Sequence, residues 1–182
     1  GETLAADGVV LALPPSRVRA AAPAALAADP QLGDSPIVSA HVWYDRPVMP
    51  ETFSAVIDSP VQWVFNRPAM TGDGGGGHQV AVTMSGARRA VALSRDELER
   101  LVQDEIAALY PAARTATVLA CAVIKEPRAT FAAAPGQATR RPGVATAMDG
   151  VALAGAWTDT GWPATMEGAV RSGIGAARHL LG

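Results

Sequence analysis

The sequence predicts a mixed fold in which an α/β unit, formed by the two ends of the chain, flanks an inserted α+β domain. Alternating strand patterns follow one another between residues 35 and 126, and one amphipathic helical pattern covers residues 95–109. Near the C-terminus, a short apolar strand at residues 151–155 runs through a glycine- and proline-rich turn into a helix. These observations predict domain limits of 1–34, 35–126 and 127–182.

Length and composition restrict the classes of protein to consider. The chain has 182 residues, of which 49% are hydrophobic and 18% charged, enough for one domain or one and a half. A net charge of −2 argues against a nucleic-acid partner. The single cysteine, Cys121, excludes an intramolecular disulfide, and three scattered histidines lack metal-ligand spacing, so no metal site is expected. No apolar run reaches the roughly 20 residues of a membrane span, and we expect a cytoplasmic location.

The first part of the chain contains mostly strand patterns. We predict a strand at 8–13 and one or two short helices between Ser16 and Leu32, broken at Pro23 and Pro30. Four strands are predicted at 37–45, 52–58, 61–66 and 79–85, separated by turn signals typical of an antiparallel meander. The glycine-rich run Gly72–Gly77 precedes the last of them, so a strand pattern follows it and not the helix that a dinucleotide fingerprint opens. It therefore indicates a mobile hairpin loop rather than a phosphate cradle.

A capping box marks the start of the long helix. In Ser94-Arg-Asp-Glu97, the hydroxyl and the carboxylate can satisfy the first free amides of a helix at Arg95–Leu109, which ends before Pro111. This helix should cover one face of the meander. A strand at 115–124, an irregular connection at 125–148, a strand at 151–155 and a helix at 165–181 complete the prediction.

The turn between the last strand and the last helix has the composition of a ligand cradle. Pro163 suits the first turn of a helix, and the free amides that follow it form a partly positive end that favours an electron-rich ligand. Gly168, Gly173 and Gly175 lie mainly on one side of this helix, where they would admit either a packed backbone or a flat ligand. Spacing alone leaves both alternatives open.

The segment Trp157 to Gly173 resembles the C-terminal flavin-binding signature of the FAD-dependent amine oxidase and phytoene desaturase superfamily. It is most similar to the squalene-associated desaturases, the hydroxysqualene dehydroxylases. The stretches Val9–Pro15, Ser35–Pro47 and Ser59–Arg67 agree with this resemblance. It implies a partial FAD-binding, Rossmann-like domain with an inserted antiparallel-sheet substrate domain, and FAD as the cofactor.

The resemblance also implies which residues contact the cofactor. They are Gly155, Ala156, Trp157, Asp159, Gly161, Trp162, Pro163, Ala164, Thr165, Met166 and Gly168, and the backbone amides of Ala164, Thr165 and Met166 are the candidate donors to the flavin. Many relatives carry an acidic residue where this chain has Ala156, so either Asp159 compensates or that contact is absent. Glu167 has a structural and a cofactor-binding interpretation of equal weight.

Trp43, Trp63 and Phe65 are the candidate substrate-binding residues. Because side chains alternate along a strand, Trp43 shares a face with His41, and Trp63 shares a face with Phe65 on another strand. These aromatic side chains could form part of the core or the wall of a ligand site. The resemblance favours an apolar tunnel for an isoprenoid lipid, with removal of the hydroxyl of hydroxysqualene by hydride transfer from reduced FAD. An acid must assist the departure of the hydroxyl group. Asp159, Tyr44 and Asp45 are candidates, and no catalytic residue is assigned.

Other functions remain open at this point. They are a flavoenzyme for a carotenoid, a porphyrinogen or an amine, and a non-catalytic module that binds apolar ligands. The sequence has no strand pattern that leads through a G-x-G-x-x-G turn into a helix, so the resemblance implies the C-terminal fragment of a longer flavoenzyme, inactive without its N-terminal half. A lipid substrate further implies peripheral contact with the inner face of the membrane.

Overall fold

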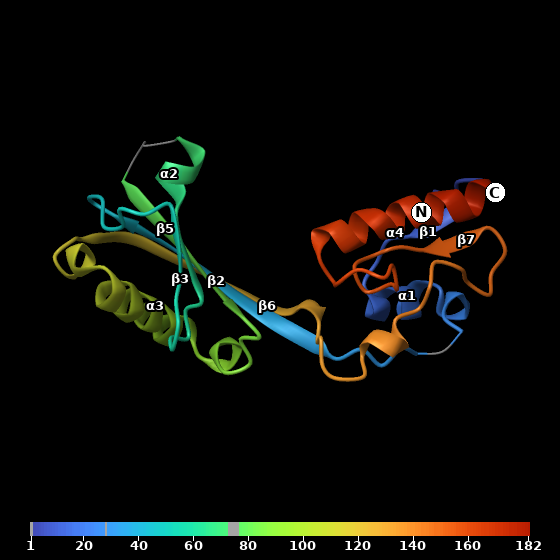
Figure 1. Cartoon of the computed structure of the whole chain (residues 1–182), viewed down its shortest axis with the longest axis horizontal. Coiled ribbons are helices and arrows are strands. Elements are labelled where there is room, and N and C mark those ends of the chain that lie inside the picture. The colour runs from blue at the N-terminus through green and yellow to red at the C-terminus, as the bar shows by residue number, and fades with distance from the viewer. Residues whose placement is uncertain (1, 28, 73–76) are drawn as a thin grey trace. The chain divides into compact units, whose positions relative to one another are not determined.

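The computed structural model describes residues 2–27, 29–72 and 77–182, which form two compact units (Figure 1). Unit 1 comprises Gly1–Asp34 and Thr130–Gly182, and unit 2 comprises Ser35–Ala129. Most of the loop predicted at Gly72–Gly77 lies outside the described residues. Among the described residues, none of the helices is both long and apolar enough to span a bilayer.

Unit 2 is built on a five-stranded sheet with the strand order β3-β4-β5-β2-β6. Its strands are β2 (Asp34–Tyr44), β3 (Phe53–Ala55), β4 (Trp63–Asn66), β5 (His78–Ser85) and β6 (Val118–Phe131). β2 pairs antiparallel with β5 from Ile37 opposite Ser85 to Tyr44 opposite His78. Side chains along β2 alternate between buried and half-buried, so one face of the sheet is core and the other is accessible.

The helix α3 (Arg95–Leu109) covers the core face of this sheet, as the sequence predicts (Figure 1). Leu98, Val102 and Ile106 are its buried residues, one turn apart. The capping box is present: the Ser94 hydroxyl accepts from the Glu97 amide at 3.2 Å, and the Glu97 carboxylate accepts from the Ser94 amide at 2.7 Å. These two bonds fix where the helix begins.

Ser94→Ala should lower the free energy of unfolding by about 1 kcal/mol, because it removes the acceptor for one helix amide. Ser94→Asp retains an acceptor at the same position and serves as the matched control. Urea denaturation followed by circular dichroism measures both. Equal losses in the two variants would contradict a role for the side-chain oxygen.

Unit 1 has three layers around a two-stranded parallel sheet of β1 (Val9–Leu11) and β7 (Val151–Leu153). On one side, α1 (Pro15–Ala21) packs Val18 against Leu153. On the other, α4 (Met166–Leu181) packs Ala176 against Ala152 and Ala154 (Figure 1). The side chains of β7 thus point alternately to the two helices, which places its C-terminal end next to the start of α4.

The fold differs from the predictions in three places. The four strands predicted as a meander do not all pair in chain order, because β2 pairs with β5 and not with β3. The helix α2 (Arg67–Thr71) was not predicted, although Asn66 caps it and Gly72 ends it at φ +72°. The strand β6 continues to Phe131, whereas the prediction ended it at residue 124. The 3₁₀ helices are η1 (Pro23–Ala25), η2 (Ala90–Ala92), η3 (Pro111–Arg114) and η4 (Ala138–Arg140).

Candidate functional site

The turn between β7 and α4, residues 155–168, is called the C-terminal turn below. It starts at Gly155, whose φ of +140° disfavours a side chain. A Cβ at this position would lie 2.6 Å from the indole nitrogen of Trp157. The Gly155 amide donates to the Ser172 hydroxyl of α4 at 2.7 Å. The first residue of the turn is therefore fixed against the helix that follows it.

Trp157 and Thr158 are internal supports of the C-terminal turn. The Trp157 side chain is buried, and its Nε1 donates to the Leu13 carbonyl at 2.9 Å. The Thr158 hydroxyl donates to the Gly155 carbonyl at 2.9 Å. Because the Trp157 ring is part of the core of unit 1, the predicted contact of this residue with a cofactor would use main-chain atoms.

Arg141 holds the C-terminal turn from outside, a role that the sequence analysis did not identify. Its guanidinium donates to the carbonyls of Ala156 at 3.0 Å and Trp162 at 2.8 Å. It also donates to the carbonyls of Trp157 and Thr158. One planar cation therefore gathers four backbone oxygens, which suits the fixed fork of arginine donors.

The start of α4 leaves backbone donors free. The Thr165 hydroxyl caps the helix by accepting from the Gly168 amide at 3.2 Å, and the Thr165 amide donates to the Pro163 carbonyl at 2.8 Å. Pro163 thus lies before the helix cap, not in the first turn as expected, because Thr165 is still extended. Among the described residues, the amides of Ala164 and Met166 have no acceptor.

Charged and aromatic groups surround these free amides. The Glu167 carboxylate is paired with Arg171 at 2.7 Å, and the Arg171 guanidinium lies 4.4 Å from the ring centre of Trp162. Trp162 is 42% exposed. Asp159, proposed as a substitute for the missing acid at Ala156, accepts from the Gly161 amide at 3.0 Å within the turn itself.

The donors of the C-terminal turn fit the pyrimidine edge of a flavin. Free amides at and just before the positive end of a 16-residue helix favour an electron-rich ring edge. Gly161 has φ +67°, and nothing within 4 Å would meet a Cβ there, so the backbone is open to close approach. The buried Thr160 hydroxyl has no partner among the described residues. Ala164 and Met166 are the residues that would hold the ring edge.

The second candidate region lies on the accessible face of the unit 2 sheet. There, Phe53, Trp63 and Phe65 form what is called the aromatic wall. Phe53 lies opposite Phe65, and Ala55 lies opposite Trp63. The Trp63 and Phe65 rings stack with centroids 6.2 Å apart and an interplanar angle of 13°. A cavity of about 440 Å³ is lined by Phe53, Trp63, Phe65, Met70 and Thr83.

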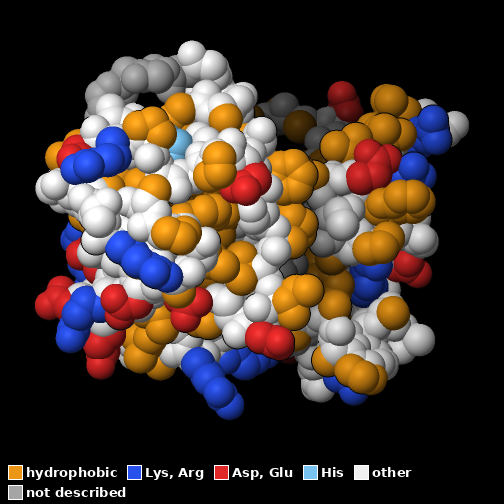
Figure 2. Space-filling model, turned by 60° about the vertical axis from the view of Figure 1, so that its left-hand side comes forward, with side chains coloured by type: hydrophobic (Ala, Val, Ile, Leu, Met, Phe, Trp, Pro, Cys, Tyr) orange, Lys and Arg blue, Asp and Glu red, His pale blue; other side chains and the backbone are white. Residues whose placement is uncertain are grey.

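Trp43 shares the accessible face but lies outside the lining of this cavity, because β5 separates its strand from β4. Trp63 is 41% exposed and Phe53 is 57% exposed. Trp63 and Phe53 are thus among the large hydrophobic side chains that are exposed at the surface. Figure 2 shows one face of the molecule, on which hydrophobic side chains lie between charged groups. An exposed aromatic set of this kind suits an apolar ligand.

Two of the candidate acids lie away from the aromatic wall. Tyr44 is buried on the core face, and burial, followed by the nearby Cys121, raises the pKa of its hydroxyl to about 12. The Asp45 carboxylate binds the Arg46 guanidinium and the Thr117 amide, and these contacts lower its pKa. Neither group is suited to give a proton to a ligand on the wall.

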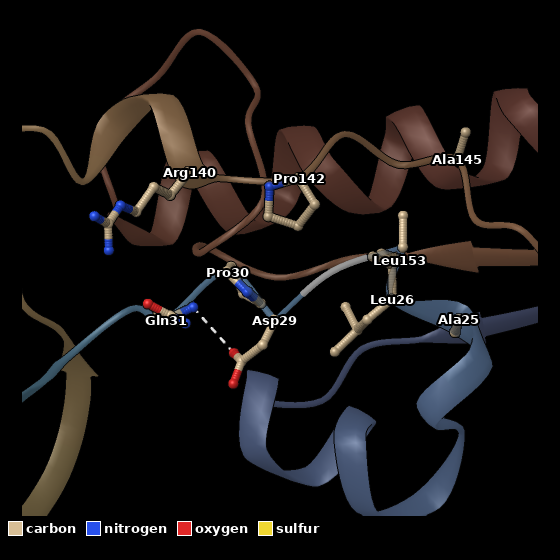
Figure 3. Close-up of a pocket in the computed structure, with 10 residues that line it drawn as sticks. Ala25, Leu26, Asp29, Pro30, Gln31, Arg140, Pro142, Ala145 and Leu153 are labelled. Carbon is tan, nitrogen blue, oxygen red and sulfur yellow. Dashed lines mark hydrogen bonds between the residues drawn. The ribbon is translucent and has the colours of Figure 1, made fainter.

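Unit 1 has a further cavity of about 410 Å³ on the side of α1 (Figure 3). Its labelled lining residues are Ala25, Leu26, Asp29, Pro30, Gln31, Arg140, Pro142, Ala145 and Leu153. The Asp29 carboxylate accepts from the Gln31 amide at 3.0 Å and pairs with Arg19 at 2.9 Å. Its acidic group is thus already bound within the chain, and the free amides of the C-terminal turn are not among its lining.

Comparison with known proteins gives the family of the chain. The family model described as flavin containing amine oxidoreductase matches residues 1–181. Hydroxysqualene dehydroxylase of Rhodopseudomonas palustris is 38% identical over 96% of this chain and 38% of its own length. That of Sinorhizobium fredii is 34% identical over 96% of this chain and 39% of its own. The chain therefore spans about two-fifths of the length of these relatives.

A solved structure supports the fold. The putative protoporphyrinogen oxidase from Exiguobacterium sp. 255-15 superposes with a TM-score of 0.72 at 19% identity. The match covers 97% of this chain and 42% of that protein. At this identity, the likeness concerns the arrangement of helices and strands alone.

Proposed function

The chain belongs to the flavin containing amine oxidoreductase family, and on that premise we propose that it forms part of an FAD-dependent oxidoreductase for an isoprenoid lipid. The proposed reaction converts hydroxysqualene to squalene. When bound, the reduced flavin supplies the hydride. In this proposal the C-terminal turn holds the ring edge through Ala164 and Met166, and the aromatic wall holds the lipid.

The observation that carries the proposal is the aromatic cavity of unit 2. Its lining residues, Phe53, Trp63, Phe65, Met70 and Thr83, include a single hydroxyl and no charge. A triterpene offers no charged group, so its affinity must come from buried apolar area, roughly 25 cal/mol per Å². An amine substrate would gain little from such a lining. The named relatives in Rhodopseudomonas and Sinorhizobium point to the same substrate class.

A carotenoid is the second candidate substrate. The 15-cis-phytoene desaturase of Glycine max is 26% identical over 80% of this chain. The apolar wall would suit a carotenoid equally well, so the reaction product must distinguish the two functions.

Residues outside this sequence are part of the proposal. A dinucleotide needs a glycine fingerprint between a strand and a helix for its pyrophosphate, whereas the run Gly72–Gly77, which has the spacing, is followed by the strand β5. We therefore propose that the adenosine half of FAD is bound by a further segment, and that this chain alone is inactive. The apolar substrate also leads us to propose a cytoplasmic protein with peripheral contact to the inner face of the membrane.

The test uses the longer protein that includes this further segment, loaded with flavin and chemically reduced under anaerobic conditions. It is incubated with hydroxysqualene, and squalene is measured by mass spectrometry. We expect squalene in an amount that depends on reduced flavin. Trp63→Ala should raise KM roughly tenfold through lost apolar contact, whereas Leu109→Ala, an exposed truncation on α3, should not. Absence of squalene, with desaturation of phytoene in a parallel incubation with the flavin oxidised, would favour the carotenoid function.

A further inference from the structure

A hydrogen-bonded polar pair lies on the same accessible sheet face as the aromatic wall. His41 of β2 and Gln79 of β5 are half-buried, and their side chains meet at 3.1 Å between the His41 Nδ1 and the Gln79 Nε2. The His41 ring also lies 6.1 Å from the ring centre of Trp43.

The strand register connects His41 to the cavity. Phe53 lies opposite Phe65, Phe65 opposite Ala81, and Ala81 opposite His41. One row of side chains therefore crosses four strands from the cavity to the imidazole. Adjacent strands are about 4.8 Å apart, so His41 lies roughly 10 Å from Phe65 along this row. The intervening residue is Ala81, which is 8% exposed.

The contact with Gln79 determines which nitrogen of His41 can donate. An amide nitrogen is a donor only, so the Gln79 Nε2 donates and the His41 Nδ1 accepts. The neutral imidazole then carries its hydrogen on Nε2. Gln79 therefore leaves His41 with one donor that is not used by the pair, beside an otherwise hydrocarbon row.

We propose that the His41 Nε2–H donates a hydrogen bond to the hydroxyl oxygen of the isoprenoid alcohol, and that Gln79 positions the ring for this contact. The inference rests on the proposed function and adds the residue that distinguishes an alcohol from a hydrocarbon. A donor at this oxygen also stabilises the negative charge that develops there as the carbon–oxygen bond breaks. A site built to bind a hydroxyl discriminates against the ligand that lacks it.

The test compares the dissociation constants of hydroxysqualene and squalene for the flavin-loaded protein. With the flavin oxidised, no hydride is available, so binding is measured without turnover. Quenching of tryptophan fluorescence is the readout, since Trp43 lies beside His41 and Trp63 lines the cavity. His41→Phe should reduce the preference for the alcohol about five- to tenfold and leave the affinity for squalene unchanged.

Thr83→Val is the matched control, because it removes the hydroxyl that lines the cavity and should leave the preference intact. An unchanged preference in His41→Phe, or its loss in Thr83→Val, would overturn the inference. If His41→Phe fails to fold, Gln79→Leu is tested in its place. It removes the hydrogen bond that positions the His41 ring, so it should also reduce the preference for hydroxysqualene over squalene. Failure of the unaltered protein to bind either ligand would instead reject the proposed function.

Discussion

Arg141→Ala is expected to lower the free energy of unfolding of unit 1 by about 3 kcal/mol, a large effect for a side chain near the surface. The guanidinium binds four carbonyl oxygens of the C-terminal turn, among them those of Ala156 and Trp162 at 3.0 and 2.8 Å. Hydrogen bonds from a charged donor contribute more than neutral ones, and the carbonyls in the half-buried contacts would lose their partner.

Two controls separate the geometry of Arg141 from its charge. Arg141→Lys keeps the charge, but a single ammonium cannot reach four oxygens in one plane, so most of the loss should remain. Arg140→Ala removes the neighbouring guanidinium and should change stability by less than about 0.5 kcal/mol. Thermal and urea unfolding measure these changes. If Arg141→Lys were as stable as the unaltered protein, charge alone would account for the effect.

The elements with strong local signals were predictable from the sequence. The helix α3 was predicted with its bounds, Arg95–Leu109, because its capping box and its apolar spacing indicate the same start and face. The last strand and helix were also predicted, with an error of a few residues. The chain's membership of the amine oxidoreductase family confirms the resemblance seen in the segment after Gly155.

Elements that depend on neighbours were predicted less well. Pro127 suggested an irregular segment, yet β6 runs through it, because β6 is at the edge of the sheet where a missing amide costs no ladder bond. The contacts of Arg141 could not be predicted, since four carbonyls presented to one guanidinium have no sequence pattern. The shared face of Trp63 and Phe65 follows from alternation, but the separation of Trp43 from the cavity depends on strand order.

The predicted cofactor residues divide into two groups in the structure. Gly155 and Trp157 act inside unit 1, where the close approach of their atoms shapes the turn. Ala164 and Met166 present free amides, which a bound ring edge can use. The residues predicted to contact the cofactor therefore include some whose observed role is to pack the turn and hold it in place.

Gly168→Ala should destabilise unit 1 by about 2 kcal/mol, although alanine is ordinarily the better helix former by about 1 kcal/mol. A Cβ at Gly168 would lie 2.5 Å from the Pro163 carbonyl oxygen, a backbone atom that cannot move without displacing the start of α4. The substitution should therefore also weaken flavin binding, because the amides of Ala164 and Met166 lie in the segment that must shift.

Gly173→Ala in the same helix is the matched control. Nothing within 4 Å would meet its Cβ, so the intrinsic preference should dominate and stabilise the protein by about 0.5–1 kcal/mol. Urea denaturation should thus give changes of opposite sign for one chemical substitution at two positions of α4. Stabilisation by both alanines would mean that the segment before the helix yields easily, and the C-terminal turn would then lack the rigidity that preorganised donors require.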